Sequence, residues 1–243
     1  MSHRTKNIAI DIGNSSIKVG LFNHSHLEKD WTCHSVEEVV SIVNQSGAIR
    51  IMFCSVASSV DPFLSLLQDF EINILSASTP IPFENHYKTK HTLGVDRIAA
   101  LAGAEAISHG KNNLVIDIGS CITYDFLDKK NIYHGGSISP GIDLRFKAMN
   151  SYTEKLPLIT EWESAELIGT TTKESMVSGV LNGITEELDG MISRYQAKWP
   201  DLEVIMCGRG LNSFESKLKA SIFASPKLVL VGLNRILEYN EKI

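Results

Sequence analysis

The feature of this chain that most constrains its fold is an acidic turn that occurs twice. One apolar run ends in Asp11 within NIAIDIGNSSIKVGLF, and a second ends in Asp117 within NLVIDIGSCITYDFLD. In both stretches a glycine and hydroxyl-bearing residues follow the aspartate, and another strand-like run follows them. Because the repeat is too long for a solenoid, it predicts two similar α/β halves with a cleft between them.

The segments outside these turns alternate between helix and strand patterns. Apolar periodicity predicts helices at Val36–Asn44, Pro62–Phe70, Val95–Ile107, Gly141–Asn150 and Thr172–Trp199. The last segment, KLVLVGLNRILEY, reads as a strand followed by a helix. We place the domain boundary near Gly110, so that the first domain spans residues 1–110 and the second spans 111–243.

Composition excludes several classes of protein. The 243 residues carry a net charge of −5 without a block of Lys or Arg, which argues against a partner such as nucleic acid or a membrane surface. No apolar run approaches the roughly 20 residues of a membrane span, and the N-terminus shows no signal-peptide pattern. The four cysteines lack the spacing of a metal site, so we expect reduced thiols and a cytoplasmic location.

The two acidic turns carry the residue types that bind a polyphosphate. Glycine lets a phosphate approach the backbone, and the following N–H and hydroxyl groups are donors. An aspartate at the end of a strand can hold a cation. Two such turns could therefore hold a nucleotide from both sides, although each turn alone could also be a plain hairpin with Asp as a turn former. Neither turn is a P-loop, because GxxxxGK[ST] is absent.

The stretch LGVDRIAALAGA places a carboxylate and a guanidinium in the first turn of a predicted helix. Asp96 there is stabilised by the helix dipole and could accept a proton from a substrate hydroxyl. Arg97 could bind a carboxylate or phosphate through two N–H groups. The alternative is a helix cap followed by a solvated arginine.

Three further stretches are candidates for ligand or subunit contacts. GGSISPG could form a flexible wall or a plain turn, and MCGRG could bring bare backbone against an adenine or ribose. In IGTTTKESMVSGVLNG the threonines can cap a helix and donate to an anion. Small residues recur on one face of that helix at Ser175, Gly179 and Gly183, which predicts helix packing or a dimer contact.

Taken in order, the motifs DIGNSSIK, LGVDR, VIDIGSCITYD, GGSISPG and GTTTKESMVSG resemble those of the type III pantothenate kinases. This family belongs to the superfamily of acetate kinase, sugar kinases, heat-shock proteins and actin. The resemblance implies two ribonuclease-H-like domains, each a mixed sheet plus helices, with a nucleotide cleft between them. It implies that ATP phosphorylates the primary hydroxyl of pantothenate, the first step of coenzyme A synthesis, in a cytoplasmic homodimer whose substrate site lies near the dimer interface.

The resemblance also implies a role for each matching residue. Asp96 would be the catalytic proton acceptor, Asp11 would lie at Mg²⁺, and Asp117 would bind a monovalent cation, K⁺ or NH₄⁺. The residues implied for ATP are Asp11, Ile12, Gly13, Asn14, Ser15, Ser16, Ile17, Lys18 and Ser120. Those implied for pantothenate are Tyr87, Gly94, Val95, Asp96, Arg97 and Thr172.

The chain departs from the family pattern in a few places. Ser15 and Ser120 stand where threonine is usual, which keeps the hydroxyl, and Cys121 replaces a small apolar residue. CGRG replaces a plainer double glycine, which leaves the adenosine contacts open. Two alternatives to a pantothenate kinase are a related kinase for another small hydroxyl compound, such as an amino sugar, and a non-catalytic transcriptional accessory protein on the same fold.

Overall fold

The computed structural model describes residues 6–55, 59–162 and 165–241, which form two compact units. Unit one contains the described residues up to Gly110, residues 127–135 and the described residues from Lys227 onward. Unit two contains residues 111–126 and the described residues of 136–226. The units are therefore not continuous in sequence, because the chain returns to unit one twice.

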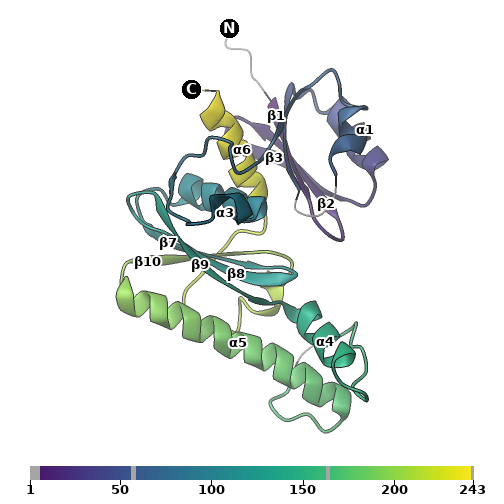
Figure 1. Cartoon of the computed structure of the whole chain (residues 1–243), viewed down its shortest axis with the longest axis vertical. Coiled ribbons are helices and arrows are strands. Elements are labelled where there is room, and N and C mark those ends of the chain that lie inside the picture. Colours follow the sequence, from purple (N-terminus) through teal and green to yellow (C-terminus); the bar gives the residue numbers. More distant parts are fainter. Residues whose placement is uncertain (1–5, 56–58, 163–164, 242–243) are drawn as a thin grey trace. The chain divides into compact units, whose positions relative to one another are not determined.

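In unit one, the described residues form a five-stranded mixed sheet (Figure 1). In chain order its strands are β1 (Lys6–Ile12), β2 (Ile17–Asn23), β3 (His26–Cys33), β4 (Arg50–Ser55) and β5 (Glu71–Ile74). Their spatial order is β3-β2-β1-β4-β5, and β1 pairs antiparallel with β2 and parallel with β4. The predicted hairpin around the first acidic turn is thus confirmed, and it lies at the centre of the sheet.

Helices cover both faces of this sheet. They are α1 (Val36–Gln45), the single turn α2 (Asp61–Leu64), α3 (Val95–Ile107) and α6 (Leu228–Asn240). Since side chains alternate along a strand, Ile8 and Ile10 of β1 share a core with α1 on one face. On the other face, the Asn7 side chain donates to that of Asn234 on α6 at 2.8 Å. Asp11 is four residues after Asn7 in β1, so its carboxylate lies on the same face of the sheet, the one that α6 covers.

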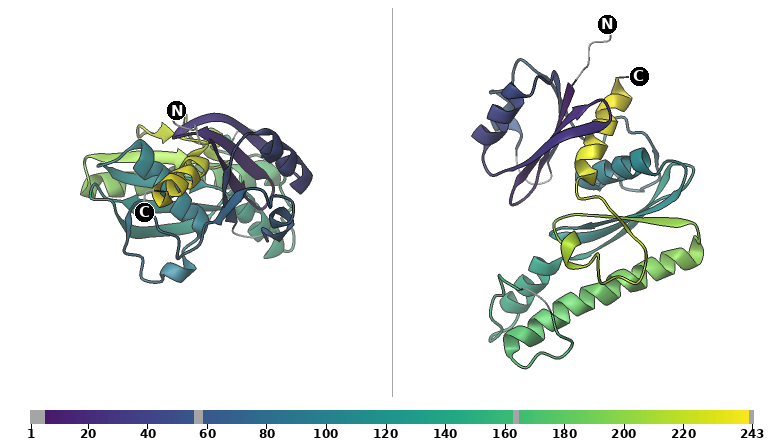
Figure 2. Two further views of the ribbon diagram at one scale, coloured as in Figure 1. Left: turned by 90° about the horizontal axis from the view of Figure 1, so that it is seen from above. Right: turned by 180° about the vertical axis from the view of Figure 1, so that it is seen from behind.

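Close backbone contact joins α3 and α6, which lie side by side in both views (Figures 1 and 2). A Cβ atom at Gly232 would lie 1.7 Å from the carbonyl oxygen of Ala99, and one at Gly103 would lie 2.4 Å from that of Leu228. Only glycine fits such distances. The small-residue helix AALAGA is therefore a packing face, and it fixes the first turn of α3.

In unit two, a long helix covers a second sheet. The elements of unit two are β7 (Asn112–Ile118), β8 (Cys121–Leu127), the last residues of β9 (Ile132–Pro140), α4 (Ile142–Ser151), α5 (Thr172–Lys198), β10 (Leu202–Cys207), the 3₁₀ turn η2 (Leu211–Ser213) and β11 (Phe223–Ala224); the last residue of β8 and the first residues of β9 belong to unit one. Fully buried Ile184, Leu188 and Ile192 of α5 belong to one core cluster with Leu114 and Ile116 of β7, and α5 lies along one face of this sheet (Figure 2). A reciprocal capping box between Thr171 and Glu174 begins α5.

The second sheet repeats the topology of the first. Its spatial order is β11-β10-β7-β8-β9-β6, in which β6 (Glu84–Asn85) pairs with the first residues of β9. If β6 is left out and the second sheet is read from its β9 end, its strand order is β9-β8-β7-β10-β11. This order corresponds strand by strand to β3-β2-β1-β4-β5 of the first sheet. The duplicated mixed α/β fold predicted from the repeated turn is confirmed; the cleft between the halves stays a prediction.

Three expectations about single elements are wrong. The segment KLVLV forms no strand, because its apolar residues begin α6 and pack against α3. The helix expected at Pro62–Phe70 is only α2, Asp61–Leu64. The stretch GGSISPG is no flexible turn, since β9 extends to Pro140. No helix in the described part of the chain is long and apolar enough to cross a membrane.

Candidate functional site

The first acidic turn links β1 to β2 as a short, hydrogen-bonded loop. The Gly13 N–H donates to the Ser16 carbonyl at 3.1 Å, and Asn14 and Ser15 are exposed at the tip. In the antiparallel register, Asp11 lies opposite Lys18. The loop therefore presents N–H and hydroxyl groups with a carboxylate and an ammonium at its base, which suits a polyphosphate and its cation.

Burial and charge tune the Asp11 carboxyl. Burial raises its pKa to about 6 from the usual 3.8, while the charge of Lys18 lowers it and that of Asp96 raises it. The parallel register puts Cys54 of β4 beside Asp11, and burial together with both carboxylates raises the pKa of that thiol well above its usual range. Asp11 and Asp96 thus share one electrostatic environment, in which a bound cation would relieve their repulsion.

The LGVDR motif places Asp96 and Arg97 in the first turn of α3, as predicted. Gly94 is the N-cap, and a Cβ atom there would lie 2.4 Å from Oδ1 of Asp96. That oxygen accepts a hydrogen bond from the Arg97 N–H at 2.9 Å. The absence of a side chain at Gly94 therefore makes room for the carboxylate.

Arg97 is buried at 7% exposure, so the alternative of a solvated arginine is wrong. Its guanidinium donates to the Tyr133 hydroxyl at 2.9 Å and lies 5.7 Å from the centre of the Tyr87 ring. The rings of Tyr87 and Tyr133 stack with centroids 6.0 Å apart and an angle of 17°. Unit one thus brings Tyr87 beside Arg97 of the LGVDR motif, and a tyrosine that the sequence did not mark contacts both.

The second acidic turn is built differently. Asp117 of β7 lies opposite Cys207 of β10 in the parallel register. Gly208 follows with a φ of +91°, and a Cβ atom there would lie 2.2 Å from Oδ1 of Asp117. The Gly210 N–H donates to the Ile118 carbonyl at 2.9 Å. The CGRG turn therefore closes over the Asp117 carboxylate with bare backbone.

Beside this turn lies a cavity of about 330 Å³ within unit two. It is lined by Ile118, Gly119, Ile142, Asp143, Thr160, Trp162, Arg209, Gly210 and Ser213. Arg209 donates to Asp143 at its rim at 3.1 Å. The adjoining Ser120 is exposed, and its carbonyl accepts the Gly141 N–H at 3.0 Å. The turn predicted to face an adenine or ribose thus borders a cavity.

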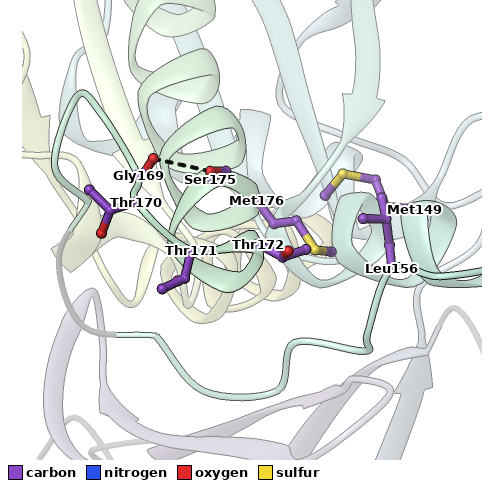
Figure 3. Close-up of a pocket in the computed structure, with 8 residues that line it drawn as sticks. All are labelled: Met149, Leu156, Gly169, Thr170, Thr171, Thr172, Ser175 and Met176. Atoms are coloured by element: carbon purple, nitrogen blue, oxygen red, sulfur yellow. Dashed lines mark hydrogen bonds between the residues drawn. The ribbon is translucent and has the colours of Figure 1, made fainter.

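Thr172 belongs to unit two and lines a second cavity, of about 530 Å³, at the start of α5 (Figure 3). This cavity is also lined by Met149, Leu156, Gly169, Thr170, Thr171, Ser175 and Met176, and Figure 3 shows Thr172 beside Met176. Ser175 donates to the Gly169 carbonyl at 3.3 Å, and Glu174 accepts from the Thr170 hydroxyl at 2.6 Å. The threonine run therefore caps the helix, as the sequence predicted, and also borders a cavity.

A carboxylate on α5 fixes the end of β9. Glu187 accepts hydrogen bonds from Tyr124 at 2.9 Å, from Ser139 at 2.5 Å and from Arg145. These bonds lower the pKa of Glu187, although burial opposes the shift. The GGSISPG segment is thus the end of strand β9, fixed by a hydrogen bond to Glu187, and does not form a flexible wall.

Protein side chains alone form no metal site in the part of the chain that the structure describes, since no group of three or more His, Cys, Asp or Glu residues comes together. A kinase holds Mg²⁺ through one or two carboxylates and the substrate phosphates. Asp11, with Asp96 near enough to act on its pKa, fits that arrangement.

Comparison with known proteins identifies the family. The family model described as type III pantothenate kinase matches residues 7–194. The chain belongs to the type III pantothenate kinase family. Type III pantothenate kinases of Cytophaga hutchinsonii and Phocaeicola vulgatus are 42% and 40% identical, covering 96% and 98% of this chain and 99% and 100% of theirs.

Solved structures of lower identity show the same fold. A protein of Campylobacter jejuni assigned to the Baf family of transcriptional activators has a TM-score of 0.62 at 21% identity, covering 97% of this chain and all of its own. A protein of Sinorhizobium meliloti assigned as a 2-dehydro-3-deoxygalactonokinase has a TM-score of 0.59 at 13% identity, covering 98% of this chain and all of its own.

Proposed function

We propose that this chain is a pantothenate kinase that transfers the γ-phosphate of ATP to the primary hydroxyl of pantothenate. The observation that carries the proposal is the cluster of Asp96, Arg97 and Tyr87 beside Asp11, in a chain that belongs to the family. In the reaction, the hydroxyl oxygen forms a bond to the γ-phosphorus, and the bond to the bridging β–γ oxygen breaks. ADP leaves, and the hydroxyl proton passes to the Asp96 carboxylate.

Arg97 and Tyr87 are assigned to pantothenate because of their chemistry. The guanidinium can hold the pantothenate carboxylate, and the Tyr87 ring offers an apolar surface with a polar tip. Gly94 and Val95 bring backbone to the same place at the start of α3. Thr172 supplies a further hydroxyl at the start of α5. These contacts would orient the substrate hydroxyl toward Asp96, and orientation is most of what phosphoryl transfer needs from a protein.

Two ions would accompany ATP. Mg²⁺ would be held at Asp11 and would supply charge neutralisation on the phosphates, which the loop from Ile12 to Lys18 and Ser120 would bind. A monovalent cation, K⁺ or NH₄⁺, would lie at Asp117. The close approach of the Gly208 backbone to Oδ1 of Asp117 supports a small ion over a phosphate there.

We also propose that the enzyme is a homodimer in the cytoplasm with neither a nucleic acid nor a membrane as partner. On α5, a Cβ atom at Gly179 or Gly183 would have no atom within 4 Å, so this smooth helix face is open. Nearby, Leu167 and Ile168 are 82% and 79% exposed. Both features suit burial by a second copy. Light scattering on the purified chain would give one subunit mass instead of two if the dimer is wrong.

The direct test combines the purified chain with ATP, Mg²⁺, K⁺ and pantothenate and measures phosphopantothenate by mass spectrometry. We expect phosphopantothenate and ADP in equal amounts, and far less of both in the same time with Asp96→Asn. ADP that forms without phosphopantothenate would contradict the assignment of the substrate. A panel of amino sugars and other small alcohols tests the sugar-type kinase, and filter binding to DNA tests the transcriptional protein.

A further inference from the structure

One buried tyrosine of unit one contacts both Arg97 and Tyr87, the two side chains that we assign to pantothenate binding. Tyr133 lies in the first half of β9 and has no solvent exposure. Its hydroxyl accepts a hydrogen bond from the guanidinium of Arg97 at 2.9 Å, and its ring stacks on Tyr87. Phe83 meets the same ring edge-on with centroids 6.3 Å apart. A tyrosine in such a place can set the position of two neighbours at once.

The backbone of Tyr133 also holds the segment that carries Tyr87. In the parallel pairing of β6 and β9, Asn85 lies opposite Tyr133, and the His86 N–H donates to the Tyr133 carbonyl at 3.0 Å. The Asn85 side chain then accepts the Tyr87 N–H at 2.8 Å. Two residues along β9, Gly135 has a φ of +104°, and a Cβ atom there would lie 3.5 Å from the Tyr87 ring. The Tyr87 ring is therefore bounded on two sides by β9.

The orientation of the Arg97 side chain is also restrained by β9, through Tyr133. An arginine side chain has many rotamers, and fixing one of them on ligand binding costs conformational entropy. A hydrogen bond that already fixes the rotamer in the free protein spares the binding step this cost. The Tyr133 hydroxyl supplies that bond, and the ring of Tyr87 supplies a cation–π contact. Both restrain Arg97 in the orientation that the structure shows.

We propose that Tyr133 is a positioning residue for pantothenate, which orients Arg97 through its hydroxyl and Tyr87 through its ring without a role in ATP binding. The inference rests on the proposed function, because it takes Arg97 and Tyr87 as pantothenate contacts. Tyr133 would then act on the affinity for the acceptor and would leave the affinity for the phosphate donor unchanged.

Steady-state kinetics of the full chain and its Tyr133→Phe variant test the proposal. The variant keeps the ring and removes only the hydroxyl. We expect the KM for pantothenate to rise about tenfold, as for loss of a hydrogen bond to a charged group, and the KM for ATP to stay within about twofold. Tyr133→Leu removes the stacking partner as well, and its KM for pantothenate should exceed that of Tyr133→Phe.

Tyr124→Phe is the matched control. Tyr124 is also buried, and its hydroxyl donates to a charged group, Glu187 on α5, in place of a pantothenate contact. We expect this control to lose thermal stability as Tyr133→Phe does while its KM for pantothenate stays within about twofold of the wild-type value. A similar rise in KM in both variants would show a general loss of structure and overturn the proposal.

Other results would overturn it as well. A KM for pantothenate that is unchanged in Tyr133→Phe excludes the hydroxyl, and equal KM values for Tyr133→Phe and Tyr133→Leu exclude the ring. If turnover is too low for kinetics, calorimetry of pantothenate binding to the folded variants gives the same comparison. The wild-type chain tests the proposed function separately, because it must form phosphopantothenate, whereas the ratio of variant to wild type tests Tyr133.

Discussion

The two acidic turns occupy equivalent places in the duplicated fold and have different surroundings. Asp11 and Asp117 are each the second-last residue of a strand, and each lies opposite a cysteine of the neighbouring parallel strand, Cys54 or Cys207. The charges of Lys18 and Asp96 act on the pKa of Asp11, and the backbone of Gly208 lies against Oδ1 of Asp117. The duplication has thus kept the strands and changed what surrounds the carboxylates.

This difference explains how one motif can serve two purposes. A carboxylate that is buried near both a cation and a second carboxylate has a charge that depends on what binds beside it. A carboxylate with glycine backbone close to one of its oxygens instead leaves limited room for a ligand on that side. We therefore assign Mg²⁺ and phosphate to the first turn and a monovalent cation to the second, and the predictions below test that division.

The largest expected effect comes from Asp96, the carboxylate whose charge raises the pKa of Asp11. We expect Asp96→Asn to lower kcat by about 10²- to 10⁴-fold, as for loss of a general base, because the amide cannot accept the substrate proton. The affinity for ATP should change little. Kinetics at saturating ATP and pantothenate, with nucleotide binding measured separately, check this. Turnover close to wild type would remove Asp96 from the chemistry.

The next effect is steric and belongs to the second turn. Gly208→Ala adds a methyl 2.2 Å from the Asp117 carboxylate at a φ of +91°, so both a clash and backbone strain follow. We expect a loss of about 3 kcal/mol in the free energy of unfolding, measured by urea denaturation. Gly119→Ala is the control, because its nearest neighbour would be at 3.7 Å. Equal losses in the two variants would mean that the Gly208 backbone does not lie against the Asp117 carboxylate.

A smaller effect concerns the pKa of Asp11. Because this pKa is raised from 3.8 to about 6, the protonated form is favoured by folding, and the stability that it contributes is lost as the pH rises through about 6. Asp11→Asn mimics the protonated form. We expect it to be about 2 kcal/mol more stable than the unliganded wild type at pH 8 and nearly equal to it at pH ~3, below the unfolded pKa. Urea denaturation at both pH values checks this; a variant that is less stable at pH 8 would contradict the pKa.

The sequence predicts the fold well where local chemistry decides it. Helix α3 begins and ends where its small-residue pattern does, and α5 begins at its threonine cap. The strand β3 has no signal in the sequence, because it is an exposed edge strand with charged residues on both faces. The apolar run of Leu228–Leu230 reads as a strand, and only packing against α3 makes it helical.

The site is predictable to a similar extent. Asp96 and Arg97 stand out because a charged pair opens an apolar helix, and Asp11 stands out because its turn is repeated. Tyr133 does not, because a tyrosine in a strand is usually a core residue, and its contacts depend on the pairing of β6 with β9. A weak signal existed, since Tyr133 directly precedes the His134-Gly135-Gly136 segment, but only the structure links it to Arg97.

The most direct test of the division between the two turns is the ion dependence of nucleotide binding. ATP affinity would be titrated against Mg²⁺ at fixed K⁺, and against K⁺ at fixed Mg²⁺, in the wild type, Asp11→Asn and Asp117→Asn. We predict that Asp11→Asn shifts the Mg²⁺ midpoint to higher concentration, and that Asp117→Asn keeps the wild-type Mg²⁺ midpoint and loses the response to K⁺. A Mg²⁺ midpoint that shifts equally in both variants, with the K⁺ response kept in Asp117→Asn, would contradict the account.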